Sequence, residues 1–351
     1  MIDFRYHLVS LISVFLALAV GIVLGAGPLR EQLGTQLAGQ VEQLRTEKDD
    51  LRASNDGLVA ANDQLGSYIT QTAPALVAGT LSDRTVGIIT DDSSTRTSVE
   101  QLSALVADAG GTAPVRVTLG EALWADGREG DRTSALAAVR SAAPDLEPVG
   151  TTDSERLASV VVELLTAPSG DLPDAERAAA LDALTSARMI TLDGTVVGPV
   201  DGLVYASAAP GDLADPTDTS ATAASTAQTL SSVQVSLLQA VVDGDVPTVV
   251  AAATPGADDT AGIIRTARAD SRFATVSTAD GFQRPDGPPV AVLALAEQFR
   301  GGEGSYGTAT GAQARIPALS AGSGAGGDSG DSGADGSSGG GSGGASDGGG
   351  R

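Results

Sequence analysis

A stretch of 19 residues without a charge, 8–26, lies near the N-terminus. As a helix it would extend about 28 Å, close to the thickness of a bilayer's hydrocarbon core. The apolar region of a cleaved signal peptide is shorter, usually about 7–15 residues. We therefore predict a retained transmembrane signal-anchor over residues 1–28. A signal peptide cut after Gly25 or Gly27 is the alternative.

The short segment before this stretch predicts the topology. Only seven residues precede it, and Arg5 with the α-amino group gives this end a weak positive charge. We expect the N-terminus to stay inside and the rest of the chain to lie outside the cytoplasm. The protein would then be a single-pass protein of the cell envelope. The inner and the outer membrane are alternatives that the sequence leaves open.

Small residues recur every four positions in the apolar stretch, at Ser13, Ala17, Gly21 and Gly25. This spacing places them on one helix face. Gly21 and Gly25 form a GxxxG pair, which lets two helices approach closely in lipid. The pattern predicts a helix–helix contact within the membrane.

A seven-residue leucine repeat follows, and we call its five leucines the leucine seam: Leu37, Leu44, Leu51, Leu58 and Leu65. With leucine at d, Asn55 and Asn62 fall at a, where Asn favours parallel two-stranded pairing. Glu47 at g would face Arg52 at e of a partner helix. We predict a parallel coiled coil over residues 29–70 and a homo-oligomer, first of all a dimer. The alternative is one amphipathic helix that folds back on the domain.

Apolar runs alternate with helical periods from about residue 80 onward, which is typical of an α/β domain. The expected strands are 86–90, 115–119, 188–193, 202–207, 248–253 and 290–296. The expected helices are 99–111, 133–142, 154–165, 174–187, 222–241 and 259–269. The strands are uniformly apolar, which indicates a sheet covered on both faces. We predict a Rossmann-like three-layer α/β domain over residues 80–317.

Residues 318–351 are mostly Gly, Ser, Ala and Asp. A segment with so little apolar surface cannot offset the entropy of folding. We predict a disordered Gly/Ser/Asp-rich tail there.

Acidic residues lie where ligands bind in α/β sheets. Asp91 and Asp92 follow the first predicted strand, at its carboxyl end. Asp193 and Asp280 also follow apolar runs, so a carboxylate cluster at one sheet edge is one interpretation. The other interpretation is that these residues cap helices and turns, as Asp commonly does.

Composition argues against several function classes. The chain has 21 Lys and Arg against 44 Asp and Glu, a net charge of −23, which is unsuited to nucleic-acid binding. It has no Cys, one His, no GxSxG motif and no Gly-rich phosphate loop, so we expect neither an enzyme nor a cofactor. Soft copper ligands are limited to Met1, Met189 and His7, so we expect no metal site.

A glycine-dense stretch, "EQFRGGEGSYGTATGA", occupies residues 297–312. Such density implies tight turns or close backbone approach. One interpretation is a ligand loop with Gly301, Gly302, Gly304 and Tyr306. The other is a structural wrap over the sheet edge with Tyr306 packed down.

Two stretches resemble a known family: "RYHLVSLISVFLALAVGIVLG" at 5–25 and "VLALAEQFRGGEGSYGTATGA" at 292–312. They are similar to the two ends of the actinobacterial copper-transport protein B family, MctB-type, and the resemblance covers roughly residues 1–317. It implies an envelope protein of copper efflux and resistance, described for the family as an outer-membrane channel. The matching motif positions are Arg5, His7, Gly301, Gly302, Gly304, Tyr306 and Gly307, and no catalytic role comes with them.

These inferences lead to two functional hypotheses. In the first, the protein takes part in copper transport and homeostasis without a soft-ligand copper site of its own. Because one helix makes no pore, any conduit would require assembled chains or partners. In the second, it is an oligomeric coiled-coil scaffold that presents a non-catalytic α/β domain to other envelope proteins.

Overall fold

The computed structural model describes residues 4–209, 213, 220–256 and 262–319, with only the backbone for residues 26–35. The prediction of a disordered tail lies outside the described residues, apart from residues 318 and 319. The predicted start of a helix at residue 259 also lies outside them.

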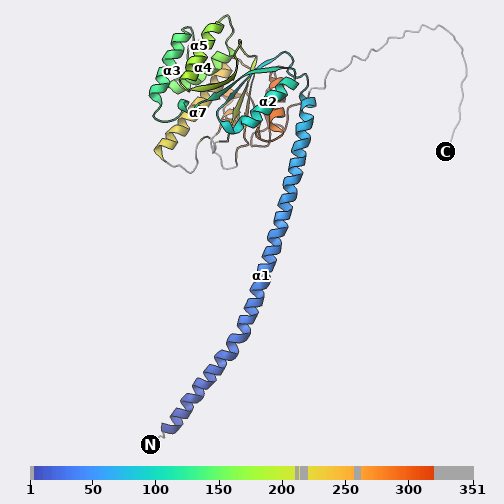
Figure 1. Cartoon of the computed structure of the whole chain (residues 1–351), viewed down its shortest axis with the longest axis vertical. Helices are drawn as coiled ribbons and strands as arrows, with labels where there is room; N and C mark the ends of the chain where they lie inside the picture. The colour runs from blue at the N-terminus through green and yellow to red at the C-terminus, as the bar shows by residue number, and fades with distance from the viewer. Residues whose placement is uncertain (1–3, 210–212, 214–219, 257–261, 320–351) are drawn as a thin grey trace, which may run out of the picture. The chain divides into compact units, whose positions relative to one another are not determined.

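Helix α1 is a single helix of 74 residues, Phe4–Val77 (Figure 1). It passes without a break through both the predicted anchor and the predicted coiled coil. The part Phe4–Gly25 is long and apolar enough to cross a membrane, judged by length and composition. The prediction of an N-terminal apolar helix is therefore confirmed, whereas the coiled coil stays a prediction.

The C-terminal turns of α1 belong to the core of the α/β domain. Ala73 and Val77 are buried in one apolar cluster with Leu102 and Val106 of α2, Arg96–Asp108. A Cβ added to Gly66 would lie 3.0 Å from Cγ of Pro285. The domain core thus begins upstream of residue 80, within the helix itself.

In the described part of the chain, seven strands form one sheet in the order β3-β2-β1-β4-β5-β6-β7. The strands are β1 (Thr85–Thr90), β2 (Thr112–Leu119), β3 (Ile190–Gly194), β4 (Gly202–Ser207), β5 (Thr248–Ala252), β6 (Ser277–Asp280) and β7 (Ser305–Tyr306). Each neighbouring pair is parallel except β2 and β3, which run antiparallel. The prediction of an α/β fold with a parallel-strand sheet is confirmed, and the finer likeness to Rossmann-like folds stays a prediction.

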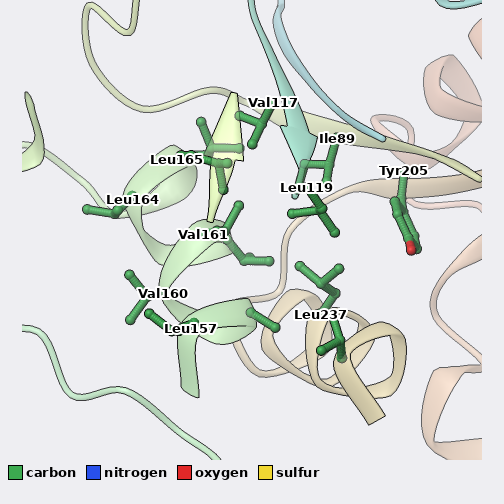
Figure 2. Close-up of a cluster of buried hydrophobic side chains, with 14 of the residues drawn as sticks. Ile89, Val117, Leu119, Leu157, Val160, Val161, Leu164, Leu165, Tyr205 and Leu237 are labelled. Atoms are coloured by element: carbon green, nitrogen blue, oxygen red, sulfur yellow. The ribbon is translucent and has the colours of Figure 1, made fainter. Parts of the chain in front are cut away.

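Helices and apolar clusters lie on both faces of the sheet. The remaining described α-helices are α3 (Glu129–Ala142), α4 (Asp153–Thr166), α5 (Asp174–Ser186), α7 (Ala221–Asp243), α8 (Ile263–Ala269) and α9 (Gly287–Gln298). Side chains alternate along each strand, so Ile88 and Val204 pack with α2 and α9, whereas Ile89 and Tyr205 pack against the opposite helices. Figure 2 shows this second face, where Ile89, Val117 and Leu119 lie opposite side chains of α4 and α7 such as Val161 and Leu237.

The predicted strand at 290–296 is wrong, because these residues lie within helix α9. Pro288 and Pro289 lie in the first turn of α9, where a proline has no helical hydrogen bond to lose. All residues from 287 to 296 are buried, so the helix has no polar face to give a period of 3.6. A short run that is apolar on every side therefore fits a buried strand equally well. Strands β6 and β7 were missed because they are short and contain small polar residues.

Candidate functional site

The leucine seam lies open on α1. Its five leucines are between 58% and 71% exposed. Asn55 and Asn62 are exposed as well, and no atom lies within 4 Å of a Cβ added to Gly21 or Gly25. In the part of the chain that the structure describes, nothing covers this face, so α1 carries an apolar strip available to a partner helix.

A second candidate lies where the strand order changes direction, between β1 and β4. The chain leaves β1 toward β2 and leaves β4 toward β5, and such a switch point is where open α/β sheets bind ligands. Asp91 follows β1 directly and Ser207 ends β4, so the sequence placed Asp91 at the correct strand end. We name the group of Asp91, Tyr205, Ser207 and Gln234 the Asp91 cluster.

The Asp91 carboxylate accepts hydrogen bonds from four groups of the protein. Oδ2 accepts hydrogen bonds from the Tyr205 hydroxyl at 2.6 Å, the Ser207 hydroxyl at 2.7 Å and Nε2 of Gln234 at 3.0 Å. Oδ1 accepts one from the amide of Ala208 at 3.3 Å. Burial raises the pKa of Asp91 and outweighs these hydrogen bonds, which act to lower it. Burial, and then the charge of Asp91, raises the pKa of Tyr205 well above its usual value.

At the switch point, the protein's own side chains surround the Asp91 carboxylate. Asp91 is only 4% exposed. Asp92 accepts a hydrogen bond from the amide of Ser94 at 2.5 Å and caps a short 3₁₀ helix, Ser93–Thr95. Both carboxylates therefore have structural roles, and ligand binding by either one stays a prediction.

The four aspartates considered from the sequence are not brought together. Asp193 lies on the antiparallel strand β3 and pairs with Arg116 of β2. Asp280 ends β6, separated from Asp91 by strands β4 and β5. Within the described ranges, no group of three or more His, Cys, Asp or Glu side chains could hold a metal ion.

The glycine-dense segment is bound to the edge of the sheet, and we call residues 301–314 the C-terminal clasp. The Tyr306 hydroxyl donates a hydrogen bond to Glu297 of α9. The amide of Gly304 donates to the Ser277 hydroxyl at 3.1 Å, and its carbonyl accepts from the amide of Thr278 at 2.9 Å. Tyr306 is buried, as the wrap interpretation predicted.

Asp280 holds the second half of the clasp. Its carboxylate accepts hydrogen bonds from the amides of Thr308 at 2.9 Å and Ala309 at 3.0 Å, and from Nη2 of Arg268 at 3.1 Å. Burial acts to raise the pKa of Asp280, but these donors outweigh burial, so the pKa lies below its usual value.

The two candidate ligand sites, Asp91 with Asp92 and the glycine-dense loop, lie at opposite ends of the parallel strands. Asp91 follows the carboxyl end of β1, whereas Gly301, Gly302 and Gly304 precede the amino end of β7. Because β1 and β7 run in the same direction, these ends cannot meet. They do not form one site, and ligand binding by either of them stays a prediction.

Sequence reasoning missed the partners of both aspartates. Gln234 is 143 residues from Asp91, and no local motif connects them. Arg268 lies in α8, 12 residues before Asp280, and its side chain is only 5% exposed. One indication of the Arg268–Asp280 pair was present in the sequence, an arginine in a short predicted helix followed closely by an aspartate.

We expect Gly307→Ala to destabilise the domain strongly. Gly307 has φ +123°, and an added Cβ would collide with the Asp280 carboxylate. We expect the free energy of unfolding to fall by about 3 kcal/mol, which lowers the melting temperature by roughly 6–12 °C. The fluorescence of the single tryptophan, Trp124, measures the melting. Gly301→Ala is the matched control, because φ is +80° there but nothing lies within 4 Å. An equal effect of both variants would contradict the proposed collision.

The lowered pKa of Asp280 predicts a loss of stability in acid. A carboxyl group with a depressed pKa in the folded state stabilises the fold fully above its unfolded value, about 4. That contribution is lost as the pH falls through the folded pKa. We expect the urea concentration at the unfolding midpoint of the wild type to decrease when the pH is lowered below about 4. The decrease should be smaller in Asp280→Asn. Parallel curves for the two proteins would contradict this assignment.

Comparison with known proteins gives the family. A search of curated proteins found no match. The sequence model described as "Copper transport outer membrane protein, MctB" matches residues 1–317, and the chain therefore belongs to the MctB family.

Proposed function

We propose that the protein is a membrane-anchored component of copper transport in the cell envelope, held as a homo-oligomer by α1. In this proposal the apolar segment of α1 spans the membrane and the leucine seam pairs chains. The α/β domain lies outside the cytoplasm and is not an enzyme. The observation that carries the proposal is the exposed leucine seam, on the same helix as the apolar segment.

The contacts of α1 support pairing rather than folding back. The helix meets the α/β domain through its last turns, at Gly66, Ala73 and Val77. The leucines from Leu37 to Leu65 are all exposed in the single chain. A parallel partner would cover them and would place Glu47 opposite Arg52 of the second helix.

Copper enters this proposal as cargo. The family description supplies the link to copper transport. The chain offers few soft ligands, since it has no Cys, one His and two Met. A conduit would therefore come from several assembled chains or from partner proteins.

A deletion strain tests the copper role. We expect cells without the protein to hold more copper and to grow less well in added copper, and the wild-type gene to restore both. Complementation with Leu51→Glu/Leu58→Glu then asks whether pairing matters, and Ala53→Glu/Ala60→Glu on the opposite face is the control. Unchanged copper content and sensitivity in the deletion strain would refute the transport role.

A scaffold role is the second candidate. It is favoured by the Asp91 cluster, in which the protein's own side chains surround a carboxylate at the place where an α/β domain binds a small ligand. A scaffold predicts that envelope complexes recovered with the protein change when the leucine seam is disrupted, while copper content does not. Unaltered complexes would count against it.

A further inference from the structure

A cavity of about 520 Å³ lies between α4 and α7, and we call it the α4/α7 cavity. Residues before α4 and the C-terminal end of α7 complete its walls, together with Arg272. This volume lies within the range typical of small-molecule sites. The cavity is separate from the Asp91 cluster and from the C-terminal clasp, since it shares no residue with either.

One part of the wall is apolar. Val149, Val162, Val235 and Ala240 line the cavity. Val149 is 61% exposed and is one of the few large apolar side chains that the domain leaves open. A ligand with a short aliphatic part would cover this surface.

The polar part of the wall combines serine, threonine and glutamine side chains with carboxylates, two of which lie where acids are unfavourable. Glu163 lies in the last turn of α4 and Asp243 in the last turn of α7, and neither turn contains a basic residue. The C-terminal end of a helix carries partial negative charge, which favours cations and disfavours carboxylates. Two such helix ends with two carboxylates make this part of the wall negative, and Oδ1 of Asp243 accepts a hydrogen bond from Nε2 of Gln239 at 2.8 Å.

A third carboxylate adds to this charge. Burial, and then the negative charge of Glu147, raises the pKa of Glu163. The hydrogen bonds of the described residues include none to the carboxylate of Glu147 or Glu163. Glu155 also lines the cavity, but its carboxylate is held by the amide of Thr151 at 2.7 Å. Glu147 and Glu163 are thus available to a ligand.

Among the described residues of the lining, Arg272 is the one cation, and it is already paired. Nη2 of Arg272 lies 2.6 Å from Oδ2 of Asp270, and its Nε lies 3.0 Å from the same oxygen. Its guanidinium also lies over the Phe273 ring, 5.2 Å from the centroid. Arg272 therefore does not neutralise the acidic wall.

We propose that the α4/α7 cavity binds a small organic cation, an ammonium group carried on a short aliphatic stem. The ammonium lies between Glu147 and Glu163, near the C-terminal ends of both helices, and the stem covers Val149 and the partly exposed Val235. The lining contains no His, Cys or Met, so it lacks the ligands that copper prefers. This site is independent of the proposed copper role.

Calorimetric titration of the full chain in detergent tests the proposal, with n-butylammonium chloride as the probe and detergent alone as the blank. We expect saturable binding of one probe per chain. Butan-1-ol, which has the same stem without the charge, should bind at least about tenfold more weakly. Saturable binding of butan-1-ol with similar affinity would overturn the ionic part of the proposal.

Three variants locate the site. Glu163→Gln should weaken n-butylammonium binding about tenfold, and Glu147→Gln should weaken it severalfold. Glu100→Gln, on the exposed face of α2, is the matched control and should bind as the wild type does. Trp124 fluorescence melts verify that each variant is folded. Binding that survives Glu163→Gln, or a cavity that takes magnesium chloride but not n-butylammonium, would overturn the proposal.

Discussion

Leu51→Glu/Leu58→Glu is expected to convert the full chain in detergent from a dimer into a monomer. In a parallel pair each of these leucines would become buried, and burying one leucine is worth about 1.5–3 kcal/mol. The double change removes four such side chains per dimer and places four carboxylates in their place. We expect the mass from light scattering, corrected for bound detergent, to fall by half.

Matched variants make this result specific. Ala53→Glu/Ala60→Glu adds the same charges at exposed positions on the opposite face of α1, and the dimer should persist. Asn55→Leu/Asn62→Leu should alter the oligomer state, because polar residues at a restrict the pairing to two strands. An unchanged mass after Leu51→Glu/Leu58→Glu would show that the leucine seam does not pair chains.

Asp91→Ala should cause the largest loss of stability among substitutions in the α/β domain. The change leaves the Tyr205 hydroxyl, the Ser207 hydroxyl and the Gln234 amide without their common acceptor in the core. An unsatisfied buried donor costs about 1–3 kcal/mol, so we expect a total of at least about 4 kcal/mol. Urea unfolding followed by Trp124 fluorescence measures this loss, because Trp124 is buried in the same domain.

Asp92→Ala is the neighbouring control for the same experiment. Its carboxylate accepts a single hydrogen bond at the start of a short 3₁₀ helix, so we expect a loss of about 1 kcal/mol. A loss of similar size in both variants would mean that the Asp91 cluster is not a special source of stability. Recovery of stability in Asp91→Ala/Gln234→Leu, which removes one orphaned donor, would support the assignment further.

Helices and strands could be predicted from the sequence where the pattern of apolar residues reflects the local structure. The strands expected at 86–90 and 115–119 and the helix expected at 99–111 match β1, β2 and α2, which form a parallel β-α-β unit. The apolar segment predicted an N-terminal helix for the same reason. The same reasoning predicted a strand in place of helix α9. Burial on every side of this helix removes the periodic pattern that distinguishes helices from strands.

The candidate sites were predictable only in part. The position of Asp91 at a strand end followed from the sequence, because parallel strands share their carboxyl edge. Its partners did not, since Tyr205 and Gln234 come from β4 and α7, more than 100 residues away. Contacts over such separations depend on the folded topology, which residue pattern alone does not contain.

The C-terminal clasp also determines how the sheet ends. Edge strands expose unpaired backbone groups that can recruit other chains. Here the amides of Gln313 and Ala314 donate to the carbonyl of Ser305 at 2.7 and 3.3 Å, and the amide of Gly307 donates to the carbonyl of Ala314 at 3.0 Å. The chain thereby closes its own β7 edge. Truncation before Gln313 would leave this edge unpaired, so we expect the shortened protein to associate with other chains more readily.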